Sequence, residues 1–340
     1  MFSHFLQHNS HGARFFFVLS GFLMAYLIDS GYREFFLRRM LRIYPTFLIA
    51  VIVVIVGRGI IFHSVGFNIA VVKAMLLLPF GTTPVYPLGV EWTLVYEVFF
   101  YMVCAIFAND LLRRAFPYFL IAWLGWLFFA EVCLGSDAWF SAENGASIGL
   151  PTIGHIPSSF MNELFIAGGL TYHVFKRLPP LGARWTGPII AVGIGVFVFA
   201  EQFVSRRGLM GKSFLPPSIS ITTIRVSLHS VSFALIVLGA CAFERGREGI
   251  RRSGRVWEVL ERFGDHSYAL YLIHVPIITV IIVEARAWSN GRPIGNEVCV
   301  VALATALVAG WYFGRFDVWM HNWFKRRLFA KGEKRVLMAA

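Results

Sequence analysis

Pro87-Leu-Gly-Val-Glu-Trp-Thr-Leu-Val-Tyr-Glu97-Val-Phe-Phe-Tyr101 is an apolar, aromatic stretch that carries Glu97 in its interior. Its composition is that of a membrane-spanning segment, where an unpaired carboxylate is costly. Such residues usually face the interior of a helix bundle or a wet cavity, so a functional site is the first hypothesis for Glu97. The alternative is a structural ion pair or a polar contact between packed helices.

The composition extends this interpretation to nearly the whole chain. Of the 340 residues, 57% are hydrophobic and 15% are charged, which indicates a polytopic membrane protein. We therefore expect an all-α bundle of transmembrane helices, with one domain over residues 1–330 and a basic tail over 331–340. The predicted complete spans, each close to the roughly 20 residues that cross a bilayer, are 14–29, 43–62, 88–108, 116–134, 156–175, 186–204, 218–243, 266–285 and 297–314.

The basic residues that give the net charge of +12 are distributed unevenly between the two sides of the predicted membrane protein. If the connection 30–42 lies inside, 22 of the 31 Lys and Arg residues fall on the cytoplasmic side and seven on the outer side. This bias predicts a cytoplasmic C-terminus, with the basic segments against membrane lipids. No nucleic-acid partner is expected. The four cysteines have no Cys-x-x-Cys spacing, so neither a metal site nor a disulfide framework is expected.

Two histidines near the N-terminus are candidates for acid-base chemistry. His4 and His8 are four residues apart and would share a helical face. Histidine is the usual general base near neutral pH, and a carboxylate such as Glu97 could fix its tautomer and stabilise the imidazolium. A solvated chain end is the alternative.

Arg38, Arg39 and Arg42 follow the first complete span. A cluster of this kind at the cytoplasmic surface can bind phosphates through forked guanidinium hydrogen bonds. The alternative is an ordinary basic connection on the cytoplasmic side.

Further polar residues lie within predicted spans. Arg225 and His229 are four apart, and Glu163 begins another apolar run, so these residues line a polar cavity or pair with one another. The hydroxyls and imidazole between Ser267 and His274 could bind a headgroup or a cofactor. They could equally cap the helix and anchor it at the membrane interface.

Four segments, in this order along the chain, resemble the integral-membrane acyltransferase 3 family, whose members are O-acyltransferases of surface and secreted carbohydrates. The third segment resembles the subgroup that acts in exopolysaccharide production. No internal repeat accompanies them. The segments are Phe15-Phe-Phe-Val-Leu-Ser-Gly-Phe-Leu23, Phe36-Leu-Arg-Arg-Met-Leu-Arg-Ile-Tyr-Pro45, Trp92-Thr-Leu-Val-Tyr-Glu-Val-Phe-Phe-Tyr101 and Phe263-Gly-Asp-His-Ser-Tyr-Ala-Leu-Tyr-Leu-Ile-His-Val-Pro276.

The resemblance implies an active histidine before the first segment, followed by an aromatic residue, and His4-Phe5 matches this pattern better than His8. The family places an arginine eleven positions earlier, which here would fall before Met1. We therefore expect nine complete spans plus a truncated N-terminal half-span. The full family architecture would have ten spans with both termini inside, in agreement with the charge distribution.

The expected activity is transfer of an acyl group, most simply acetyl from acetyl-CoA, to a hydroxyl of an envelope or exported glycan in the bacterial inner membrane. The acceptor would be a polysaccharide or a lipid-linked sugar. His4 would act as general base, Glu97 would orient it, and Arg38, Arg39 and Arg42 would bind the coenzyme A phosphates. A transporter or flippase of a glycan precursor, a non-catalytic scaffold and an inactive truncated member are the alternatives. The oligomeric state stays open.

Overall fold

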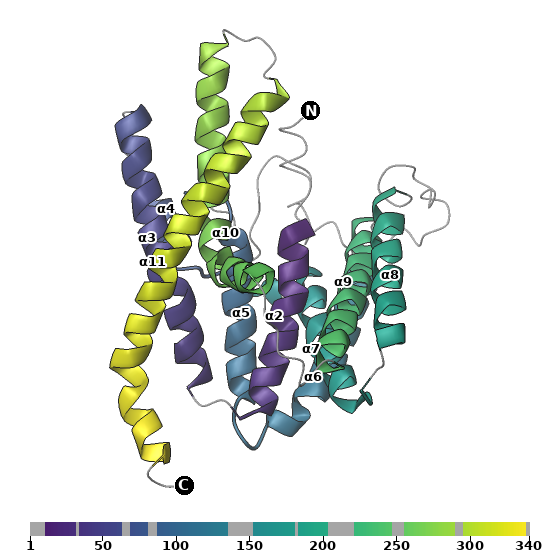
Figure 1. Cartoon of the computed structure of the whole chain (residues 1–340). Helices are drawn as coiled ribbons and strands as arrows, with labels where there is room; N and C mark the ends of the chain where they lie inside the picture. Colours follow the sequence, from purple (N-terminus) through teal and green to yellow (C-terminus); the bar gives the residue numbers. More distant parts are fainter. Residues whose placement is uncertain are drawn as a thin grey trace. The chain divides into compact units, whose positions relative to one another are not determined.

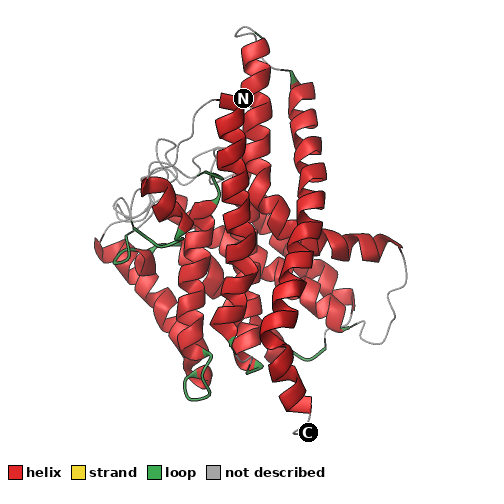
Figure 2. Ribbon diagram, turned by 90° about the vertical axis from the view of Figure 1, so that its left-hand side faces the viewer, coloured by secondary structure: helices red, strands yellow, loops and turns green. Residues whose placement is uncertain are grey.

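The structure, a computed structural model, describes residues 11–31, 34–62, 69–80, 87–134, 152–180, 183–202, 221–246, 255–289 and 295–337. Within these ranges the regular elements are helices (Figure 2). An isolated bridge joins Phe80 to Thr152. The all-α prediction is confirmed. The helices are α2 (His11–Asp29), α3 (Phe35–Phe62), α4 (Ile69–Met75), α5 (Glu91–Phe107), η1 (Arg113–Ala115), α6 (Phe116–Leu134), η4 (Ile156–Ser158), α7 (Met161–Arg177), α8 (Ala183–Phe199), α9 (Ile221–Arg245), α10 (Arg255–Trp288) and α11 (Asn296–Leu337).

Every predicted span overlaps one of these helices. Among the described residues, seven helices are long and apolar enough to cross a membrane, namely α2, α3, α6, α8, α9, α10 and α11. Helices α5 and α7 have 17 residues each, slightly fewer than the roughly 20 that a perpendicular crossing needs. The chain is therefore a multi-pass membrane protein.

Some boundaries differ from the sequence expectation. Helix α10 begins at Arg255, eleven residues before the predicted span 266–285, and α11 continues to Leu337 through most of the basic tail. Hydropathy locates only the apolar part of a helix. Lys, Arg and Glu are good helix formers, so the helical backbone continues beyond the hydrocarbon-compatible segment.

The chain divides into two compact units. One contains α2, α6, α7, α8, α9 and α5 from Trp92 onward. The other contains α3, α4, α10 and α11. Figure 1 labels these helices along the chain, and both units contain polar clusters, which are considered below.

In the first unit, two glycines allow close contact between α2 and α7. A Cβ atom on Gly21 would collide with the carbonyl oxygen of Phe165, and one on Gly168 would collide with that of Val18. Small residues at a helix crossing let the two backbones approach, which is the usual basis of packing within a bilayer. The segment Phe15–Leu23 is therefore fixed against α7, and Ser20 with it.

In the second unit, α10 packs along α11. A Cβ on Gly314 would collide with the side chain of His266, and one on Gly310 would collide with that of Leu270. The ring of Trp311 lies 4.6 Å from that of His266, centroid to centroid. This close packing fixes the register of the two helices and the position of the polar residues that follow on α11.

Candidate functional sites

The structure describes four of the five residues predicted to carry the chemistry. His4 lies outside the described residues, as does His8. Glu97 is in the first unit, and Arg38, Arg39 and Arg42 are in the second. Each cluster is described within its own unit.

Glu97 is buried on α5, with 5% of its surface exposed. The hydroxyl of Tyr101, one turn later on the same helix, donates a hydrogen bond to Oε1 of Glu97. The Ser20 hydroxyl on α2 lies 3.5 Å from the same oxygen and 3.5 Å from the Tyr101 oxygen. The carboxylate thus makes a polar contact between packed helices. It also has a fixed orientation, which a catalytic role requires.

Helix α9 carries a polar face toward its neighbours in the first unit. Thr223 donates to Glu131 on α6 at 2.7 Å, and Ser227 donates to Glu163 on α7 at 2.8 Å. Both carboxylates are buried. Glu163 therefore has a hydrogen-bond partner on the helix that also carries Arg225 and His229.

His229 is fully buried and links three helices. Nη1 of Arg14 lies 2.8 Å from Nδ1 of His229, and Nε2 of the same ring lies 3.0 Å from a carboxylate oxygen of Glu201. Arginine can only donate, so Nδ1 must accept and the proton of the neutral ring lies on Nε2, facing Glu201. The other oxygen of Glu201 is 3.5 Å from Nε2 of His11.

His11, Glu201 and His229 also have the donor types of a metal site. Each offers one potential ligand atom, and the three atoms lie within 4.8 Å of one another. A metal ion would need the lone pair of neutral His229, which accepts the hydrogen bond from Arg14. The nearby guanidinium charge opposes a cation as well. These residues therefore fit a hydrogen-bonded polar network better than a metal centre.

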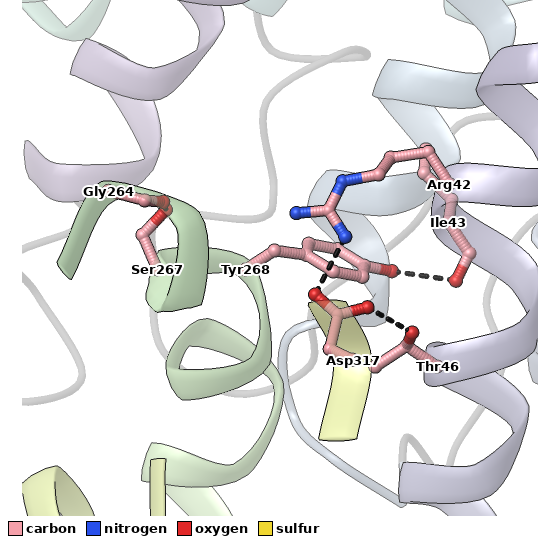
Figure 3. Close-up of polar contacts among 7 residues, drawn as sticks. All are labelled: Arg42, Ile43, Thr46, Gly264, Ser267, Tyr268 and Asp317. Atoms are coloured by element: carbon pink, nitrogen blue, oxygen red, sulfur yellow. Dashed lines mark hydrogen bonds and ion pairs between the residues drawn. The ribbon is translucent and has the colours of Figure 1, made fainter. Parts of the chain in front are cut away.

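Arg42 lies at the junction of α3, α10 and α11 in the second unit. Its guanidinium donates to Asp317 at 2.6 Å, and Thr46 on the next turn of α3 donates to the other oxygen of Asp317 (Figure 3). The Tyr268 ring lies under the guanidinium, 5.3 Å from it, and the Tyr268 hydroxyl donates to the carbonyl of Ile43 at 3.0 Å. We call Arg42, Thr46 and Asp317 the α3–α11 pin.

Arg38 and Arg39 lie one turn before Arg42 on α3, and both are half-buried. Ser267 makes a local contact, donating to the carbonyl of Gly264 at 2.7 Å (Figure 3). Because α10 begins at Arg255, Ser267 lies in the interior of the helix, and this bond is not the helix cap that we gave as the alternative to ligand binding. Tyr268 instead connects its helix to α3.

The four segments that suggested the family meet in pairs. The first and third meet where Ser20 approaches Glu97. The second and fourth meet where Tyr268 bonds to Ile43. Segments far apart in the sequence thus share polar contacts in both units.

Comparison with known proteins gives the family. A model described as an acyltransferase domain matches residues 10–315. The chain belongs to the acyltransferase 3 family. No curated protein and no solved structure matches it. The sequence-based prediction of a membrane-bound acyltransferase is confirmed.

Two acidic residues of this acyltransferase were missed at the sequence level. Glu201 closes the His229 network, and Asp317 is fully buried against Arg42. Glu201 lies in the last turn of the predicted span 186–204, and Asp317 lies just beyond the span 297–314. Near the end of a span an acidic residue is expected to be solvated. The available signal was the excess of basic residues within spans, because Arg14 and Arg225 need acidic or hydrogen-bonding partners.

Proposed function

We propose that the chain transfers an acyl group, most simply acetyl from acetyl-CoA, to a hydroxyl of an envelope or exported glycan. The family supplies the reaction class. The observation that carries the site assignment is the contact of Ser20 and Tyr101 with the buried Glu97 carboxylate, where two family-like segments meet. The acceptor would be a polysaccharide, in line with the exopolysaccharide resemblance, or a lipid-linked sugar.

In this proposal His4 removes the proton of the acceptor hydroxyl while Glu97 orients the imidazole. The hydroxyl oxygen attacks the thioester carbonyl, and the C–S bond then breaks. The departing thiolate takes the proton from the imidazolium, so proton and charge balance. General base catalysis contributes about 10²–10⁴-fold, and the rest comes from holding donor and acceptor together.

Arg38 and Arg39 would bind the phosphates of the acyl-CoA. Arg42 can contribute to the same task, because a guanidinium has five N–H donors and its bond to Asp317 uses Nη1. The basic residues on the 30–42 side support a cytoplasmic donor site and a cytoplasmic C-terminus in a bacterial inner membrane.

The test is incorporation of labelled acetyl groups into envelope and exported glycans by cells that express the chain at matched membrane levels. His4→Ala and Glu97→Gln should abolish labelling. Exposed residues of the same types provide controls, and His155→Ala and Glu258→Gln should retain it. Labelling that survives both site variants would refute the assignment, and a parent that never labels any glycan would refute the proposed reaction.

A further inference from the structure

The α3–α11 pin fixes how two basic helix segments meet in the second unit. Arg42 and Thr46, one turn apart on α3, both hydrogen-bond to Asp317. His321 lies one turn beyond Asp317, and the charges of Arg42 and Arg39 act on its ring. A later turn of α11 thus meets an earlier turn of α3, so the two helices run in opposite directions, as Figure 1 shows.

Lys325 lies on the same face of α11 as the pin. Residues four apart share a helical face, which places Asp317, His321 and Lys325 in one row, and the charge of Lys325 also acts on His321. Arg326, next in the sequence, is rotated by about 180° from Asp317 at about 100° per residue. It therefore belongs to the opposite face.

This row places the imidazole of His321 where the charges of both Arg39 and Lys325 act on it. Asp317 is the acid that acts on the His321 ring, but both of its oxygens already accept hydrogen bonds from Arg42 and Thr46. Within the described part of the chain, no hydrogen-bond partner lies within reach of the buried Nδ1 atom of His321. Two cationic side chains beside an imidazole nitrogen without a partner suit a bound anion, because the cations attract it and a ring N–H can donate to it.

We propose that Arg39, His321 and Lys325 form a phosphate-binding site, and that its ligand is a phosphate of coenzyme A. This inference rests on the proposed function and adds α11 to the donor site that α3 was expected to form alone. Arg39 supplies a planar fork of donors, and Lys325 supplies a mobile ammonium group at the exposed edge. The pin holds the two helices in the register that lets them act together. A lipid headgroup presents the same phosphate chemistry, but the half-buried His321 and Arg39 favour a ligand that enters between the helices.

The test is the affinity of the purified full-length protein for coenzyme A, measured by calorimetry in detergent micelles. Lys325→Ala and His321→Ala should each weaken binding about ten-fold, the expected cost of one charge-assisted hydrogen bond. Arg326→Ala removes the same charge as Lys325→Ala from the opposite face and should leave the affinity unchanged. Equal thermal unfolding of Lys325→Ala and the parent would exclude misfolding, since Lys325 is exposed.

A second ligand identifies which phosphate is bound. If the effect of Lys325→Ala disappears with 3′-dephospho-coenzyme A, the site holds the 3′-phosphate. If the effect persists, the site holds the diphosphate. Both results support the proposal.

Three results would overturn it. Unchanged affinity in Lys325→Ala and His321→Ala, beside a parent that binds coenzyme A, would reject the α11 site and leave the proposed function standing. A parent that does not bind coenzyme A would reject both. In the third result, the variants keep the parent's affinity for coenzyme A and change only how much protein is retained in nanodiscs that contain phosphatidylglycerol, compared with nanodiscs of phosphatidylcholine alone. That result would assign the site to a lipid headgroup.

Discussion

In the α3–α11 pin, replacing Arg42 and replacing Asp317 should lower the stability of the protein by different amounts. The Asp317 side chain is 1% exposed, whereas that of Arg42 is 28% exposed. Arg42→Ala strands a buried carboxylate, and loss of the partner of a buried charge costs about 3–5 kcal/mol. Asp317→Asn strands a guanidinium that reaches water along its flexible side chain, so the cost should be about 1–2 kcal/mol. The double variant Arg42→Met/Asp317→Leu should recover most of the lost stability, because an apolar pair of similar volume often replaces a buried ion pair at little cost.

The assay for this asymmetry is equilibrium unfolding in mixed micelles, followed by circular dichroism of the helices. If unfolding is irreversible, the half-life at a fixed temperature gives the same ranking. Arg42→Ala should be the least stable, Asp317→Asn intermediate, and the double variant close to the parent. The reasoning is refuted if Asp317→Asn is as damaging as Arg42→Ala, or if the double variant is less stable than either single variant.

Three further predictions concern the first unit. Gly168→Ala drives a methyl group into the α2 backbone and should destabilise the protein by about 1–3 kcal/mol or more. Gly195→Ala is the control and should not destabilise it, because nothing lies within 4 Å of the added Cβ. Unfolding in mixed micelles compares the two variants. Tyr101→Phe removes a donor from the buried Glu97 carboxylate and should cost about 1–3 kcal/mol together with a loss of acetyl transfer, so full activity and stability in this variant would show that the bond is dispensable. Protein purified from zinc-supplemented cells should contain well under one equivalent of metal and keep its melting temperature in chelator; a stoichiometric zinc content that His229→Ala abolishes would contradict our reading of the polar network.

The helices were predictable because a bilayer imposes a strong and local constraint. Roughly 20 apolar residues must follow one another, whatever the rest of the chain does, so the nine apolar ranges each overlap a helix. The ends were less predictable. No comparable local signal marks the start of α10 at Arg255 or the end of α11 at Leu337. Polar helix formers continue these helices outside the hydrocarbon, where hydropathy is low whether or not the backbone is helical.

The site residues were predictable only where charge and burial conflict within one segment. Glu97 was evident because a carboxylate lies in the middle of an aromatic run. Its partner Ser20 was not, since serine is common in membrane helices and nothing local connects positions 77 residues apart. Asp317 was missed for the same reason. Its partner Arg42 lies 275 residues away, and such pairings arise from the tertiary packing of helices rather than from any nearby pattern.

The pin also changes how the Arg38-Arg39-x-x-Arg42 cluster is understood. Its three arginines look alike in the sequence, yet Arg42 forms an ion pair with a buried acid, while the charge of Arg39 acts on His321. A guanidinium that must stay bound to Asp317 cannot move freely to follow a ligand, but it can hold the neighbouring turn of α3 in place. Composition alone would assign one task to all three residues, whereas the contacts within one helical turn differ: Arg42 holds the register of α3 and α11 through Asp317, and Arg39 is the residue that we propose for phosphate binding.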